Sequence, residues 1–215
     1  MWRITRTTAE MGYSYRAMCV AAEEDFRVVC LGGSAGGLQA YIAILRHIPA
    51  ARGMAFVIAA HRSSENTNLL PHILAGVTTM AVIEVEEGML LEPNHIYLMP
   101  PHTEMTVKNN GFGLQSPKKS HGWPTTISLF LLSLAEAYGQ RAISVILSGT
   151  GPDGSSALQA FKAAGGVTFA QSDAEFSDMP QHAVETGCVD FTLSSAEIAK
   201  ALLELNAPRD KKKRS

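Results

Sequence analysis

The stretch RVVCLGGSAGGLQAYIAILRH, residues 27–47, contains the clearest structural pattern in the chain. Residues 27–31 form an apolar run that is rich in β-branched side chains and stops at glycines, which is typical of a buried strand. Apolar residues then recur at helical spacing over residues 38–47, ahead of Pro49. A buried strand, a glycine-rich turn and a helix in this order indicate an α/β fold.

The alternation of strands and helices continues outward from this stretch. Further strands are predicted at residues 54–60, 81–85, 142–147 and 167–171, and further helices at 66–75, 126–138 and 155–164, with two more beginning at Pro180 and Ser195. Three short runs are interpreted as antiparallel pieces around an Asn-Asn-Gly turn at 109–111, namely residues 95–99, 104–108 and 113–115. The sequence therefore predicts a doubly wound, mainly parallel sheet with helices on both faces and a small antiparallel hairpin element.

The length, composition and net charge favour a single folded domain with no nucleic-acid partner and no membrane insertion. The chain has 215 residues, of which 46% are hydrophobic and 18% charged, with a formal net charge of −2. This length favours one folded domain, predicted at residues 26–205, between an N-terminal leader (1–25) and a basic C-terminal tail (206–215). The near-neutral charge gives no reason to expect a nucleic-acid partner. Since no run of about 18 apolar residues occurs, we expect no insertion into a membrane.

The cysteines and histidines do not follow the patterns of a disulfide framework or a metal site. Three cysteines, Cys19, Cys30 and Cys188, are too few and too scattered for either. The histidines lack the spacing of metal ligands. We therefore expect a cytoplasmic protein without a bound metal ion.

Polar residues with catalytic chemistry follow three of the predicted strands. Ser34 lies in GGSAGG (residues 32–37), His61 follows the second strand, and Asp153 lies in SGTGPDG (residues 148–154). In doubly wound sheets, catalytic groups gather beyond the carboxyl ends of the strands. Gly-x-Ser-x-Gly on a strand-to-helix turn matches a nucleophile elbow. A serine nucleophile needs a base and an acceptor that orients the base, and His61 and Asp153 fit those roles.

Simpler interpretations of the same residues stay open at this point. The Ser34 segment also fits a glycine-rich turn with a serine helix cap, and the Asp153 loop fits a Pro-Asp-Gly turn. A dinucleotide-binding loop is disfavoured, because His61 stands where that motif requires an acidic residue. Asp173 follows a strand as well and is a rival to Asp153. For Asp178 and Asp190, helix capping or solvent exposure is the simpler role.

The chain also resembles a known family over residues 27–203, and the resemblance rests on several ordered motifs. They are LGGSAGGL at residues 31–38, His61, VEEGM at 85–89, PNHIYLMPP at 93–101, LSGTGPDG at 147–154, FAQ at 169–171 and Met-Pro at 179–180. These motifs resemble the catalytic domain of CheB, the chemotaxis protein-glutamate methylesterase, most of all its form in fused methylesterase–methyltransferase proteins.

The resemblance implies Ser34 as nucleophile, His61 as general base and acid, and Asp153 as the residue that orients His61. It also implies that the backbone at Ala35 and Thr150 binds the oxyanion, and that no cofactor is needed. The implied reaction is hydrolysis of glutamyl γ-methyl esters on the cytoplasmic helices of a methyl-accepting chemoreceptor, together with deamidation of receptor glutamine. A methyltransferase or other chemotaxis proteins are the further partners that it implies.

The chain departs from the family pattern in three ways. Only residues 1–26 precede the first predicted strand, which is too few for a receiver domain, so we expect no phosphorylation in cis. Gln181 replaces the usual arginine after Met-Pro, and an aspartate often found near Ser128 is missing. We expect these two changes to affect substrate binding and not the triad. A non-catalytic scaffolding domain of the same fold, binding receptor-like helices or a signalling partner, is the alternative function.

Overall fold

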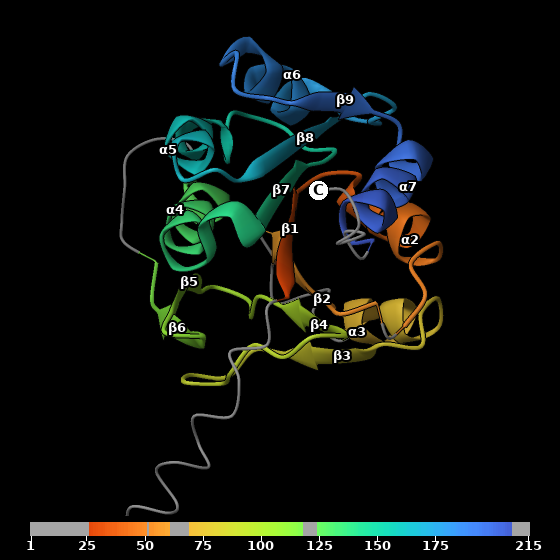
Figure 1. The fold of residues 1–215 in the computed structure, drawn as a ribbon, viewed down its shortest axis with the longest axis vertical. Coiled ribbons are helices and arrows are strands. Elements are labelled where there is room, and N and C mark those ends of the chain that lie inside the picture. Colours follow the sequence, from red (N-terminus) through yellow and green to blue (C-terminus); the bar gives the residue numbers. More distant parts are fainter. Residues whose placement is uncertain (1–25, 51, 61–68, 118–123, 208–215) are drawn as a thin grey trace, which may run out of the picture.

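The structure, a computed structural model, describes residues 26–50, 52–60, 69–117 and 124–207. Its centre is a seven-stranded sheet with the strand order β3-β4-β2-β1-β7-β8-β9, in which every neighbouring pair is parallel (Figure 1). The strands are β1 (Arg27–Gly33), β2 (Met54–Ala60), β3 (Ala81–Glu84), β4 (His95–Leu98), β7 (Ala142–Ile146), β8 (Val167–Gln171) and β9 (Phe191–Leu193). The predicted doubly wound, mainly parallel fold is confirmed.

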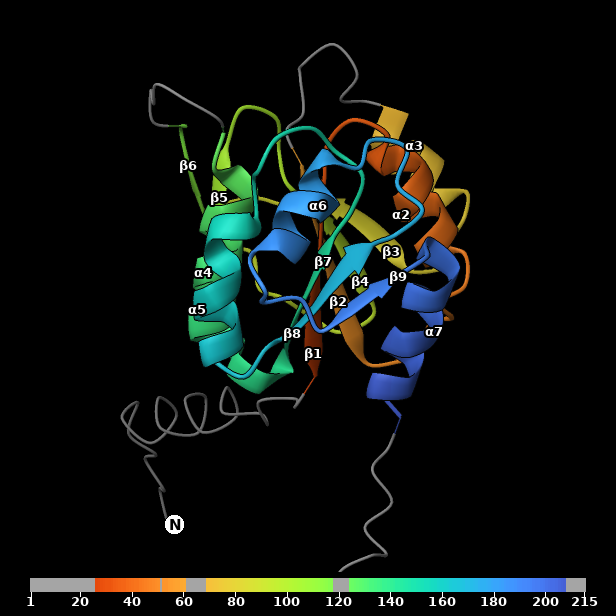
Figure 2. The same cartoon turned by 90° about the horizontal axis from the view of Figure 1, so that it is seen from above.

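Helices cover both faces of this sheet. On one face lie α2 (Gly37–Leu45), α3 (Leu69–Ala75) and α7 (Ser195–Leu205), and on the other α4 (Thr126–Tyr138), α5 (Leu158–Ala163) and α6 (Asp178–Glu185). Figure 2 shows α4 and α5 on one side of the strands and α2, α3 and α7 on the other. Two short 3-10 turns, η2 (Gly139–Arg141) and η3 (Ser155–Ala157), precede β7 and α5.

The central strands are buried on both faces, as parallel strands between two helical layers must be. Every residue of β2 and β7 is buried, and so is β1 after its first residue. Side chains alternate between the layers: Val29 and Leu31 of β1 pack toward α2 and α7, whereas Val28 and Cys30 pack toward α4. The continuous apolar runs in the sequence reflect this two-sided burial.

The strand order places the candidate site at a reversal of the sheet. The chain passes from β1 outward through β2 to β3 and β4, then returns to the other side of β1 with β7, β8 and β9. The strand before Asp153 is therefore adjacent to the strand before Ser34, as predicted. Such reversals are where open α/β sheets bind their ligands, beyond the carboxyl ends of the strands.

The structure corrects the predicted antiparallel region. Residues 95–98 form β4, which pairs in parallel with β2 and β3 inside the main sheet. Only β5 (Glu104–Lys108) and β6 (Gly111–Gln115) form an antiparallel hairpin. Asn109 and Asn110 form its turn with φ values of 50° and 63°, which the type I′ turn requires. The hairpin lies on α4, where Val107 N donates to Ser133 Oγ (3.0 Å).

Other differences lie at the ends of elements. The predicted helix at 155–164 begins as the 3-10 turn η3, and the helix predicted from Pro180 begins two residues earlier, at Asp178. Pro71 lies within α3, as the third of its described residues. The strand β9 was not predicted, because it has only three residues and two of them are exposed.

Parts of the predicted domain scheme lie outside the described residues. These are the leader at 1–25, residues 66–68 of the helix predicted at 66–75 and residues 208–215 of the basic tail. Within the described ranges, no helix is long and apolar enough to cross a membrane.

Candidate active site

Ser34 lies directly after β1, in the tight turn that leads into α2. Gly36 is the N-cap residue of α2 and has φ 72°, a left-handed conformation that favours glycine. Gly37 N donates to Ser34 O (3.0 Å) and closes the turn. Within the described residues, left-handed φ values outside glycine occur at four positions and Ser34 is not one of them. Gly36 thus makes the turn, and half-buried Ser34 keeps an ordinary backbone.

The loop that follows β7 is joined to this turn. Ser34 N donates to Ser148 O (2.9 Å), and Ser148 Oγ donates to Ala35 O (2.8 Å). A Cβ placed on Gly149 would stand 3.1 Å from Ser34 Cβ and 2.1 Å from Met179 Sδ, so only glycine fits there. The two segments that the sequence placed at one sheet edge are therefore in direct contact.

Two backbone N–H groups at this contact are available to a ligand. The carbonyl oxygens of Ser34 and Ala35 accept the hydrogen bonds from Gly37 N and Ser148 Oγ. Across the described part of the chain, neither Ala35 N nor exposed Thr150 N donates a hydrogen bond. N–H groups of this kind beside a helix N-terminus can bind a developing oxyanion.

Asp153 lies in the loop after β7 and is buried, with 5% of its surface exposed. Its carboxylate contacts the first turn of α4. Its Oδ2 accepts a hydrogen bond from Ile127 N (2.9 Å). Its Oδ1 accepts from Ser128 N (3.0 Å), Ser128 Oγ (2.9 Å) and Gly154 N (2.8 Å). These donors and the positive end of the α4 dipole compensate a buried negative charge. The buried carboxylate is thus fixed between the loop after β7 and α4.

Asp173, the rival acid, is exposed and has another set of partners. Its Oδ1 accepts from Gln171 Nε2 (3.0 Å), Ser195 N (3.0 Å) and Ser195 Oγ (3.1 Å) at the start of α7. Partial burial by itself would raise the pKa of Asp173, but the hydrogen bonds from Gln171 and Ser195 outweigh it and lower that pKa. Asp173 therefore supports the N-terminus of α7.

His61 falls outside the described residues, and its side chain stays a prediction. The strand before it is described: Ala60 ends β2 and pairs with Gly33, the residue before Ser34.

Asp190 and Ser128 have structural partners. Asp190 is exposed, which was one of its two expected roles, and it forms an ion pair with Lys162 (2.5 Å) and accepts from Thr168 N of β8 (2.9 Å). Ser128 was expected to affect substrate binding. It is 4% exposed and its hydroxyl donates to Asp153, so its side chain lies against that carboxylate, and the expected effect on substrate binding stays a prediction. Gln181, by contrast, is exposed on α6.

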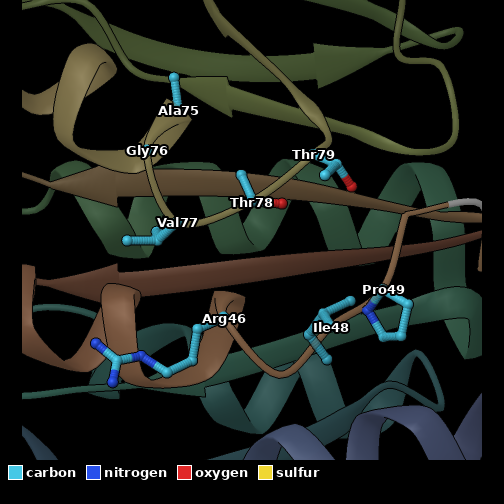
Figure 3. A pocket seen from close by; sticks show the side chains of 8 residues that line it. All are labelled: Arg46, Ile48, Pro49, Ala75, Gly76, Val77, Thr78 and Thr79. Atoms are coloured by element: carbon cyan, nitrogen blue, oxygen red, sulfur yellow. The ribbon is translucent and has the colours of Figure 1, made fainter.

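A separate pocket lies at the end of the sheet opposite to Ser34, near the amino ends of the strands. Its eight lining residues, among them Arg46, Ile48 and Thr79, come from the last residue of α3 and from the segments that follow α2 and α3 (Figure 3). These segments lead into the amino ends of β2 and β3, whereas Ser34 follows the carboxyl end of β1. In the described ranges, no group of three or more His, Cys, Asp or Glu side chains could hold a metal ion.

A family model described as CheB methylesterase matches residues 29–202. The chain belongs to the CheB methylesterase family. The crystal structure of the Thermotoga maritima CheB methylesterase catalytic domain has a TM-score of 0.76 and 27% identity, and the match covers 84% of this chain and 98% of that one.

Two curated relatives extend the comparison. A protein-glutamate methylesterase/protein-glutamine glutaminase of Nitrosospira multiformis is 31% identical over 99% of this chain and 61% of its own length. Protein-glutamate methylesterase FrzG of Myxococcus xanthus is 31% identical over 83% of this chain and 54% of its own length. The chain therefore spans about half to three-fifths of these curated relatives. The CheB resemblance seen in the motifs is confirmed at the level of the family.

Sequence reasoning missed the residues that support the site. Ser148 is 1% exposed and uses its N, O and Oγ atoms: its N donates to Gln171 Oε1 (2.8 Å), and its Oγ also accepts from Phe176 N (3.0 Å). The available signal was that Ser148 directly follows the predicted strand at 142–147 and precedes the glycine motif.

Proposed function

We propose that this chain is a serine esterase that hydrolyses glutamyl γ-methyl esters on the cytoplasmic helices of chemoreceptors and releases methanol. One observation carries the proposal: the Ser34 turn is bound to the loop after β7 through Ser34 N and Ser148 O (2.9 Å). This contact supports Ser34 as the nucleophile and the backbone N–H groups of Ala35 and Thr150 as oxyanion donors, because it joins the two segments that carry them. Relatives named protein-glutamate methylesterase support the substrate class.

In the first half of the proposed reaction, Ser34 Oγ attacks the ester carbonyl carbon while His61 takes the hydroxyl proton. The carbonyl oxygen becomes an oxyanion and accepts hydrogen bonds from Ala35 N and Thr150 N. The bond to the methoxy group then breaks, and His61 returns the proton so that methanol leaves. A glutamyl ester of Ser34 remains.

In the second half, a water molecule gives a proton to His61 and its oxygen attacks the acyl carbon. The bond to Ser34 Oγ breaks, His61 returns the proton to Ser34, and a glutamate carboxylate is released. Asp153 is proposed to orient His61 and to stabilise its protonated form. Its fixed position at the start of α4 suits this role, because the carboxylate does not have to reorganise during the reaction.

The same steps would deamidate a receptor glutamine, with ammonia as the leaving group in place of methanol. The name of the Nitrosospira multiformis relative, which includes protein-glutamine glutaminase, supports this second activity. We propose residues 26–205 as the catalytic domain and the cytoplasm as its location. A methyl-accepting chemoreceptor is the proposed protein substrate, and a methyltransferase or other chemotaxis proteins are the proposed further partners.

Methanol release from a methyl-esterified chemoreceptor fragment tests the proposal. We expect wild-type protein to release methanol, and Ser34→Ala to lower turnover by about 10⁴-fold or more, because no acyl intermediate forms. His61→Ala should cause a similar loss, and the double variant should lose little more than either single one, because the two residues act as a unit. Binding of the fragment without methanol release by wild type would favour the scaffolding function.

A further inference from the structure

Phe176 is a large apolar side chain that remains 40% exposed. It lies between β8 and α6, in a segment held by two backbone hydrogen bonds at this residue. Phe176 N donates to Ser148 Oγ (3.0 Å), and Gly149 N donates to Phe176 O (3.0 Å). The backbone of Phe176 is thus fixed to the same loop that contacts Ser34.

The ring of Phe176 stands next to the nucleophile turn. A Cβ built on Gly36 would be 3.0 Å from Phe176 Cδ2, and Gly36 follows Ser34 by two residues. Figure 2 shows the segment between β8 and α6 passing beside the beginning of α2. An exposed aromatic face therefore borders the turn that carries the Ser34 hydroxyl.

Another exposed phenylalanine, Phe191, provides a comparison. It is 45% exposed on the outermost strand β9, and its ring stacks on Phe169 with 5.1 Å between the centroids. Phe191 therefore has a packing partner within the sheet. For Phe176, the two backbone hydrogen bonds do not involve the side chain, and among the described residues its ring has no aromatic partner like that of Phe191.

We propose that Phe176 is a substrate-contact residue that packs against apolar side chains flanking the esterified glutamate on the receptor helix. This inference rests on the proposed function. On a helix, side chains three and four residues apart lie about 5–6 Å from one another, so a glutamyl ester at Ser34 brings its helical neighbours over the adjoining turn. The receptor side chain that lies over Gly36 contacts the Phe176 ring, and burial of both apolar surfaces favours binding.

The test compares two substrates. With a methyl-esterified receptor fragment, Phe176→Ala should raise KM about tenfold and leave kcat within threefold of wild type, because a buried aromatic contact is lost while the reacting groups stay in place. With p-nitrophenyl acetate, which has no helix, Phe176→Ala should lose much less activity than with the fragment. Phe176→Leu keeps an apolar contact and should restore most of the affinity for the fragment. Phe191→Ala is the matched control and should leave KM unchanged.

The outcomes separate this inference from the proposed function. If wild type releases methanol from the fragment but Phe176→Ala has an unchanged KM, the contact is wrong and the function stands. If Phe176→Ala loses activity toward both substrates equally, the residue supports the fold of the site and the contact is again wrong. If wild type releases no methanol from the fragment, the proposed function fails, and the contact fails with it.

Discussion

Asp153 Oδ1 accepts hydrogen bonds from both the backbone N–H (3.0 Å) and the hydroxyl (2.9 Å) of Ser128. Ser128 Oγ in turn accepts from Gly154 N (2.8 Å). The loop after β7 and the first turn of α4 are therefore tied together around one carboxylate. The start of α4 belongs to the support of the candidate site, although it lies 25 residues away in sequence.

This arrangement leads to a prediction for Asp153→Asn. We expect turnover to fall by about 10²- to 10⁴-fold, because an amide neither stabilises a protonated His61 nor fixes its tautomer. The amide NH₂ would also face N–H donors of α4, so the free energy of unfolding should fall by about 1–3 kcal/mol. The bonded carboxylate therefore indicates a folded but less stable variant.

Asp173→Asn is the matched control for that change, and its turnover should stay within about tenfold of wild type. The measurements are steady-state ester hydrolysis and denaturant unfolding of both variants. A larger loss of turnover in Asp173→Asn than in Asp153→Asn would reverse the assignment of the acid.

Ser148 should act as a positioning residue. Ser148→Ala removes the donor to Ala35 O and the acceptor for Phe176 N, so the turn after Ser34 loses a constraint. We expect kcat to fall by about 10- to 100-fold with little change in KM for a small ester, and Ser148→Thr to recover most of the rate. Steady-state kinetics checks both.

Ser144→Ala is the control for Ser148→Ala. Ser144 is fully buried on β7, the strand that precedes the Ser148 loop, and within the described residues its hydroxyl has no hydrogen-bond partner. We expect this variant to keep the wild-type kcat. Equal losses of kcat in the two variants would refute a specific role for Ser148.

Some strands of the sheet could be predicted from the sequence, and one was assigned wrongly. The strands β1, β2 and β7 were predictable because burial on both faces makes each a continuous apolar run. The strand β4 was assigned to the wrong sheet, since it precedes the hairpin in sequence while its partners β2 and β3 are set by tertiary packing.

The candidate site was likewise predictable only in part. The positions of Ser34 and Asp153 at the carboxyl ends of neighbouring strands could be predicted, because each residue follows a recognisable strand in a glycine motif. The hydrogen-bond partners of Asp153 could not be predicted from the sequence, because its contact with Ser128 depends on how α4 packs on the sheet. Ser148 likewise acquires its role only through segments that meet in three dimensions.

The lowered pKa of Asp173 predicts an acid dependence of stability. A carboxyl whose folded pKa lies below its unfolded value of 3.8 stabilises the protein above that pH, and the contribution is lost as pH falls through the folded pKa. Asp173→Asn should therefore have a lower Tm than wild type near pH 6, and the gap should close as the pH falls below 3.8. A gap that stays constant over thermal melts from pH 6 to pH 2.5 would contradict this.

Tyr41 offers a stabilising substitution. It is 3% exposed, and in the described part of the chain its hydroxyl has no hydrogen-bond partner. Burial, with a smaller contribution from Cys30, raises its pKa, so it stays neutral. Tyr41→Phe removes an unsatisfied polar group, and the free energy of unfolding should stay equal or rise by about 1 kcal/mol.

Tyr97→Phe is the contrasting variant. Tyr97 is equally buried, but its hydroxyl accepts from Glu92 N (2.9 Å) and donates to Leu90 O (3.2 Å). We expect this variant to lose about 1–2 kcal/mol in urea unfolding. Destabilisation of Tyr41→Phe by as much as Tyr97→Phe would mean that the Tyr41 hydroxyl is bonded in solution.

The most direct measurement of the central claim is mass spectrometry of the protein after reaction with a fluorophosphonate, which labels activated serine nucleophiles. We predict one adduct per chain, on the peptide that contains Ser34, with labelling abolished in Ser34→Ala and strongly slowed in His61→Ala. An adduct on a different serine, or no adduct on wild-type protein, would contradict the assignment of Ser34 as the nucleophile.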